Sequence, residues 1–273
     1  MNTSPLHPMP VDWEPTRATL HAYANAVGTI PRAHATPDDR WWHISLKVRP
    51  DGLVTDQMLL PDGGTFEVRM DLRKHVVVVA TDQGTGSSLS MTDGMTAREF
   101  GERLIEMVGE LGLSAEYATE KFADDDERSY DPGAAEAYLD ALTSINHNLE
   151  IRRTSLDGEV GPIQVWPHGF DIAFEWFGTR VESYQEAGDM VEAPAQLNLG
   201  FYPAGRAYIY SNPWPFDEAL TQVELPAPAQ WHTAGWQGSI LYYDDLLATD
   251  EPTARLQEYA QAVHAAALPT LTV

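Results

Sequence analysis

The chain has 273 residues, of which 41 are acidic and 17 are basic, giving a formal net charge of -24 at pH 7. This charge opposes binding to a phosphate backbone or an anionic membrane, and the sequence shows no basic stripe of the kind that nucleic-acid binding requires. The absence of cysteine excludes disulfides, thiolate metal sites and a cysteine nucleophile.

The first residues, MNTSPLHPMPVDW, lack the basic segment and the apolar core of a signal peptide. No apolar run approaches the roughly 18 residues that a membrane span requires. Apolar residues make up 43% of the chain, which is enough for a packed core. We therefore expect a soluble cytoplasmic protein with no nucleic-acid partner and no membrane partner.

The first half of the chain predicts a helix, a run of strands and a second helix. Apolar residues at helical spacing indicate a helix over residues 15–29, which Gly28 and Pro31 are expected to end. The second helix begins at Thr96, where Glu99 completes a capping box. The strands between them predict an antiparallel meander, in which 75–80 is buried on both faces. Their expected ranges are 41–48, 53–60, 66–72, 75–80 and 87–91.

The second half repeats this order after a charged segment, residues 121–131. Asp131 and Pro132 predict the N-cap and first turn of a long helix. Residues 181–196 show no clear period and are expected to form a mobile excursion or lid. The expected strands are 170–177, 197–204, 207–216 and 238–243, and the last helix is 249–268.

Strands in blocks rather than in alternation with helices favour an α+β fold, with antiparallel sheets and packed helices. We expect a single compact domain over 1–273, with two similar helix–strands–helix halves at 13–123 and 131–268.

The stretch from Gly161 to Gly178, GPIQVWPHGFDIAFEWFG, combines a strand pattern with ionisable groups. The apolar face predicted for its strand is formed by Phe170, Ile172, Phe174 and Trp176. Asp171 and Glu175 fall on the opposite face, about 13 Å apart on an ideal strand, which is longer than either glycosidase geometry. His168 lies close enough to Asp171 for an oriented general base. The predicted catalytic residues are His168, Asp171 and Glu175, against the favoured alternative of a polar outer strand face.

Four motifs place a histidine beside an aromatic residue or a strand border: TLH at 19–21, WWH at 41–43, WPHGFD at 166–171 and WHTAGW at 231–236. With Glu175 they offer histidine and carboxylate ligands for zinc or iron. No two of these histidines are close in sequence, so the favoured alternative is that they are half-buried and bonded to backbone among tryptophans. The metal and any cofactor stay open.

Most of the 8 tryptophans lie in short motifs punctuated by glycine or proline. Aromatic walls with a few polar groups form small-molecule pockets, but they also form cores and homodimer interfaces. We predict an aromatic-lined pocket for a small molecule, and hydrolytic or metal-assisted chemistry is the more specific form of this hypothesis. The alternative is a non-catalytic structural or interaction protein. The predicted ligand-binding residues are Trp42, His43, Trp166, Trp176, Trp231 and His232.

One set of motifs resembles a bacterial family of full-length proteins described only as a domain of unknown function. The motifs are TLH, WWHISLKV, SYDPGAA, WPHGFDIAF, GFYPAG, YSNPWPF and WQGSILYYD, in this order from about residue 13 to 267. The resemblance implies one full-length domain. It implies no activity, cofactor or catalytic residue.

Overall fold

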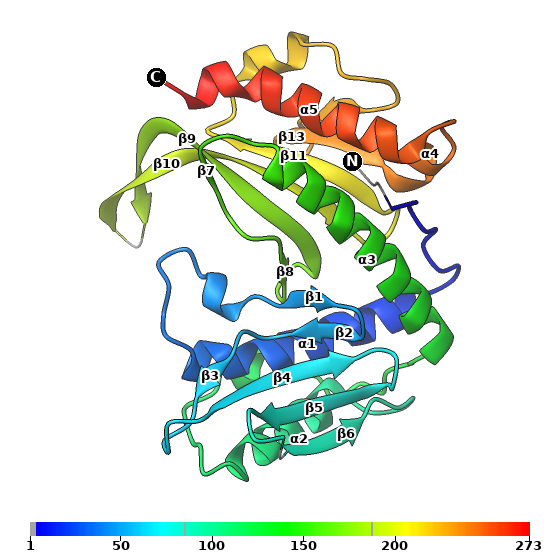
Figure 1. Ribbon diagram of the computed structural model, residues 1–273, viewed down its shortest axis with the longest axis vertical. Helices are drawn as coiled ribbons and strands as arrows, with labels where there is room; N and C mark the ends of the chain where they lie inside the picture. Colours follow the sequence, from blue (N-terminus) through cyan, green and yellow to red (C-terminus); the bar gives the residue numbers. More distant parts are fainter. Residues whose placement is uncertain (1–3, 85, 187) are drawn as a thin grey trace. The chain divides into compact units, whose positions relative to one another are not determined.

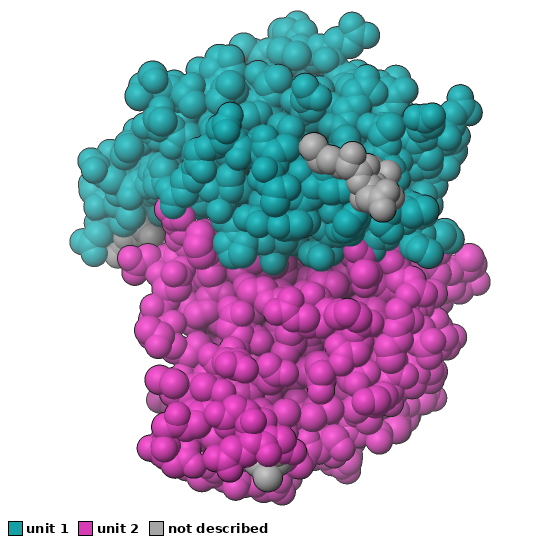
Figure 2. Space-filling view, viewed as in Figure 1, with its two compact units in different colours: residues 1–8, 144–163, 172–273 teal, residues 9–143, 164–171 magenta. Residues whose placement is uncertain are grey.

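Two antiparallel sheets and packed helices confirm the α+β class (Figure 1). The computed structural model describes residues 4–84, 86–186 and 188–273. The chain forms two compact units, shown in different colours in Figure 2. Unit 1 comprises 1–8, 144–163 and 172–273, and unit 2 comprises 9–143 and 164–171. The single domain expected over the whole chain stays a prediction.

Unit 2 contains the meander expected in the first half of the sequence. Its sheet has the order β1-β2-β4-β5-β6, with β3 paired to β4. Its helices and turns are α1 (Glu14–His34), η1 (Trp42–Ile44), α2 (Ala97–Gly109), η2 (Thr119–Lys121) and the first part of α3 (Pro132–Thr154). Its strands are β1 (Lys47–Arg49), β2 (Gly52–Val54), β3 (Met58–Leu59), β4 (Thr65–Asp71), β5 (Val76–Thr81), β6 (Gly86–Ser90) and β8 (Gln164–Trp166).

Local side-chain signals set several of these elements. In β4, Phe66, Val68 and Met70 are buried, as their alternation predicts. The Thr96 side chain accepts a hydrogen bond from the Glu99 backbone N–H at the start of α2, which confirms the predicted cap. Oδ1 of Asp131 accepts from the Gly133 N–H at the start of α3, 2.8 Å away.

Three sequence predictions in unit 2 are wrong. Strand β5 alternates between buried and partly exposed residues instead of being buried on both faces, and α2 packs against it. The expected strand over 41–48 is a turn of 3-10 helix followed by the short β1. Helix α1 runs past Pro31 to His34, and the Ala35 N–H closes its last turn on the Pro31 carbonyl. Gly28 does not end the helix. A Cβ on Gly28 would lie 2.9 Å from the Pro167 ring, so it allows close packing.

Unit 1 is a sheet of order β12-β13-β11-β10-β9-β7. Its strands are β7 (Glu159–Val160), β9 (Asp171–Glu186), β10 (Asp189–Tyr202), β11 (Tyr208–Trp214), β12 (Gln230–His232) and β13 (Gly238–Tyr242). Its helical elements are the end of α3, η3 (Glu218–Gln222), α4 (Tyr243–Leu247) and α5 (Pro252–Leu271). Helix α5 packs on β10 and β11.

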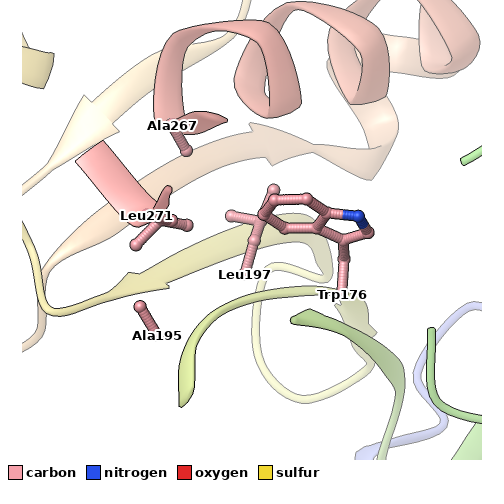
Figure 3. Close-up of a cluster of buried hydrophobic side chains, with 5 residues drawn as sticks. All are labelled: Trp176, Ala195, Leu197, Ala267 and Leu271. Carbon is pink, nitrogen blue, oxygen red and sulfur yellow. The ribbon is translucent and has the colours of Figure 1, made fainter. Parts of the chain in front are cut away.

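Figure 3 shows the core between α5 and the sheet, where Trp176 and Leu197 meet Ala267 and Leu271. A buried polar chain ties α5 to the strands. Its hydroxyl groups are those of Tyr259, Ser239 and Ser211, joined at 2.7 and 2.6 Å. Because each of these hydroxyl groups has a hydrogen-bond partner, the network is buried without leaving an unsatisfied polar group.

Residues 181–186 and 189–196 are not irregular, because they continue β9 and β10 as a two-stranded ribbon. The mobile excursion or lid expected over 181–196 stays a prediction. Val181 pairs with Pro194, and Tyr184 with Val191. The pairing register of β9 and β10 shifts at Ala195. This irregularity interrupts the alternation of side chains, two residues apart, by which a strand is recognised in a sequence. Ala187 lies outside the described residues. None of the helices in the described ranges has the length and hydropathy to cross a membrane.

Candidate functional site

The WPHGFD motif forms a tight turn in unit 2. After β8, the Phe170 N–H donates to the Trp166 carbonyl at 2.7 Å. Phe170 has a φ of 56°, in the left-handed region that is costly for a bulky side chain. Its ring is 1% exposed and lies 5.5 Å from that of Tyr138, so burial of the ring offsets the backbone strain. The Oδ1 of Asp171 lies against Gly169, where a Cβ would collide with it.

This turn positions His21 of α1. Nε2 of His21 is 3.0 Å from the carbonyl oxygen of His168, and its ring stacks on Phe170 at 5.7 Å. Because a carbonyl only accepts, Nε2 carries the proton in the neutral ring and Nδ1 keeps its lone pair. Burial lowers the pKa of His21. Thus the backbone of His168, rather than its ring, supports a second histidine.

His21 lines a hollow of about 340 Å³ between α1 and the 120–128 segment. Two arginines line the same hollow, and both are paired: Arg17 with Glu14 and Arg128 with Asp124. The positive charge of these two groups is therefore balanced by neighbouring carboxylates. We call this site the His21 hollow.

The WWH motif forms a separate aromatic group in unit 2. Trp41 has a φ of 61° and its side chain is 51% exposed, with the Arg32 guanidinium 4.9 Å from its ring. His43 stacks on Trp41 at 5.6 Å, and its Nδ1 accepts from the Asp38 N–H at 3.1 Å. Burial lowers the pKa of His43. These contacts agree with the interpretation of this histidine as half-buried and bonded to backbone.

Trp42 and Trp166 are both partly exposed. The Arg40 guanidinium lies 5.1 Å from the Trp42 ring. The rings of Trp166 and His168 are 5.9 Å apart. The two predicted ligand-binding tryptophans of unit 2 therefore contact polar side chains two residues away in the sequence.

Two predicted site residues of β9 are buried in unit 1. Glu175 is 8% exposed, so this strand lacks the half-exposed polar face that its alternation predicts. Trp176 donates from Nε1 to the Asp157 carbonyl at 2.8 Å, and its ring meets His264 at 4.8 Å and an angle of 88°. Asp171 belongs to unit 2. Within 4–84, 86–186 and 188–273, no group of three or more His, Cys, Asp or Glu side chains is arranged to hold a metal ion.

The WHTAGW motif leads to a larger group of rings on the sheet of unit 1. The β-ladder pairs Tyr202 with Tyr208, and Tyr208 with Tyr242, so one tyrosine from each of β10, β11 and β13 lies side by side. Tyr210 follows on the same side of β11, because side chains two residues apart share a face. We call this group the aromatic face. Its members are Tyr202, Tyr208, Tyr210, His232, Trp236 and Tyr242, all partly exposed.

Two glycines make room for the rings of the aromatic face. A Cβ on Gly200 would lie 2.7 Å from the Tyr210 hydroxyl, and a Cβ on Gly238 would lie 2.5 Å from the Trp236 ring. The two rings therefore lie against neighbouring backbone. Trp236 approaches His232 at 4.6 Å and runs nearly parallel to Tyr208, at 15° and 6.3 Å.

One cation already contacts the aromatic face. The Arg206 guanidinium lies 3.9 Å from the centroid of Tyr242. Arg206 also pairs with Asp244 at 2.9 Å and Asp245 at 2.7 Å. Its hydrogen bond to Asp244 lowers the pKa of that carboxyl group. Trp231 makes separate contacts: its Nε1 donates to the Val223 carbonyl at 2.8 Å, and its ring meets Phe216 at 6.4 Å.

Sequence reasoning identified His232 but omitted the tyrosines of the aromatic face. The signal was present in AYIYSN, where Tyr208 and Tyr210 alternate with the buried Ile209 and Ser211. The sequence does not show the strand register, which places Tyr202 and Tyr242 on either side of Tyr208.

The two sheets with their helices define an α+β protein with partly exposed aromatic residues on one sheet. The chain belongs to a family of unknown function, DUF5996, whose model matches residues 8–271. This confirms the resemblance to a family of unknown function that covers nearly the whole chain. No curated protein and no solved structure matches the chain.

Proposed function

We propose that this protein binds a small molecule at the aromatic face of unit 1. The observation that supports the proposal is the continuous contact of six partly exposed rings around Tyr208 and Trp236. Rings with exposed faces and polar tips supply both apolar contact area and hydrogen bonds to a ligand.

Two glycines let rings of the aromatic face lie close to the backbone. Gly200 and Gly238 have no side chain where the Tyr210 hydroxyl group and the Trp236 ring approach the strands. The rings are thereby held in place with little freedom to lose when a ligand binds. By contrast, Trp176 is 5% exposed and its indole N–H is already bonded.

Ligand-observed NMR with single-ring aromatic fragments tests the proposal. Fragments should bind the full chain, and binding should be lost in the Trp236→Ala variant. Trp41→Ala is the matched control, because it removes an exposed tryptophan of unit 2. Circular dichroism checks that both variants are folded. Equal fragment binding by wild type and Trp236→Ala would rule out the aromatic face as the site.

The His21 hollow supports a second candidate function, proton transfer to or from a small ligand. In this proposal His21 is the base through Nδ1, and His168 and Asp171 act as positioning residues in the turn beneath it. Nitrogen-15 NMR of the His21 ring tests this assignment. We expect the Nε2–H tautomer and a pKa below the ordinary 6.5. A ring protonated at Nδ1 would overturn the role of His21 as base. A homodimer through the tryptophan motifs, the alternative from the sequence, stays a prediction.

A further inference from the structure

The chemistry of the aromatic face also indicates the class of its ligand, an inference that rests on the proposed function. The chain has 41 acidic and 17 basic residues. Next to the rings, Arg206 is outnumbered by Asp244 and Asp245, both of which it pairs with. An anionic ligand would meet this excess negative charge, whereas a cation would be attracted by it.

The ring faces of this chain already hold cations. Guanidinium groups lie over Tyr242, Trp41 and Trp42 at 3.9, 4.9 and 5.1 Å from the ring centroids. Ring faces carry negative electrostatic potential, so a cation within about 6 Å of the centroid is attracted to them. At Tyr242 the Arg206 guanidinium also pairs with Asp244 and Asp245. A cation is therefore attracted there both by the ring face and by the two carboxylates.

We propose that the aromatic face binds a small organic cation of the methylated ammonium class. The cation rests on the rings around Tyr208 and Trp236, with Asp244 and Asp245 supplying the negative field. A methylated ammonium suits this face better than a primary amine, because its weakly hydrated methyl groups make apolar contact with several rings.

Calorimetric titration of the full chain tests the proposal with two probes of the same shape, choline and its neutral carbon analogue 3,3-dimethyl-1-butanol. We expect choline to bind about tenfold more tightly, as about two exposed cation–π contacts would give. Raising the salt concentration should weaken choline binding and leave the neutral probe unchanged.

Substitutions place the cation on the rings. Tyr208→Phe keeps the ring and should retain choline binding, whereas Tyr208→Leu and Trp236→Leu should abolish it. Arg206→Gln should bind choline several-fold more tightly, because it frees the Tyr242 ring and leaves two aspartates unpaired. General damage to the fold would not raise affinity. Trp41→Leu is the control that should bind as wild type does.

The outcomes separate this inference from the proposed function. If choline and its neutral analogue bind with equal affinity, or if neutral aromatic fragments bind and choline does not, the inference of a cationic ligand is overturned. The aromatic face then remains a site for a neutral ligand. Choline binding that survives both leucine substitutions places the cation elsewhere and overturns the inference. If neither fragments nor choline bind, the proposed function fails as well.

Discussion

Unit 1 contains two tryptophan–histidine pairs with nearly the same ring separation and opposite surroundings. Trp176 meets His264 at 4.8 Å, and Trp236 meets His232 at 4.6 Å. Trp176 of the first pair is 5% exposed and belongs to the core beneath α5 (Figure 3), whereas both members of the second pair are partly exposed. The comparison shows that a ring contact alone does not distinguish a structural role from a binding role. Burial and the use of polar atoms do.

The largest expected difference between the pairs is in stability. Trp176→Ala should lower the free energy of unfolding by about 3–5 kcal/mol, because it leaves a cavity beside Leu197 and Leu271 and removes a half-buried hydrogen bond to Asp157. Urea denaturation followed by circular dichroism measures this change. A loss below about 1 kcal/mol would mean that the Trp176 ring is not a core element.

A smaller effect is expected at the glycine beneath the second pair. In Gly238→Ala the new Cβ meets the Ser211 carbonyl and lies 2.5 Å from the Trp236 ring. The strand must shift and the ring must move, so we expect a loss of about 1–3 kcal/mol. The NMR shifts of the Trp236 ring should change together with those of Tyr208. Unchanged ring shifts would show that Trp236 does not lie over this glycine.

The first pair also predicts a pH dependence. Burial lowers the pKa of His264 to about 4, and its Nε2 is buried with no hydrogen-bond partner among the described residues. In the unfolded chain His264 has its ordinary pKa of 6.5. It therefore binds a proton more readily there than in the folded chain. The contribution of His264 to stability is fully present above pH 6.5 and is lost as the pH falls toward 4.

This loss should amount to about 1–2 kcal/mol, because the partly exposed ring is screened by solvent. Denaturation at pH 7 and pH 4.5 measures it, and His264→Gln should reduce the difference between the two values. An NMR titration of His264 with a midpoint near 6.5 would contradict the assignment.

Sequence reasoning succeeded where the signal is local. The alternation in β4 and the caps at Thr96 and Asp131 depend on residues within a few positions of one another. It failed where distant packing decides the backbone. Phe170 takes a positive φ because its ring packs against Tyr138 and His21, which lie far away in the sequence.

The same limit applies to the two candidate sites. The motifs identified His232 and the turn around His168, because aromatic residues beside histidine and glycine are visible in a sequence. They did not reveal that His21 would meet the His168 carbonyl, or that Gly200 would face Tyr210. Both facts depend on tertiary packing or strand register, which no local pattern encodes.

The smallest expected effect completes the comparison. Trp236→Ala should lower the free energy of unfolding by less than about 1 kcal/mol, because its partly exposed ring leaves no enclosed cavity when it is removed. In parallel urea denaturations, Trp176→Ala should unfold at a much lower urea concentration than the wild type. Trp236→Ala should unfold at nearly the wild-type midpoint. If Trp236→Ala is as damaging as Trp176→Ala, the aromatic face serves to hold the sheet together. A near-neutral Trp236→Ala that loses fragment binding would instead separate the two pairs by role, one holding α5 on the sheet and the other presenting rings to a ligand.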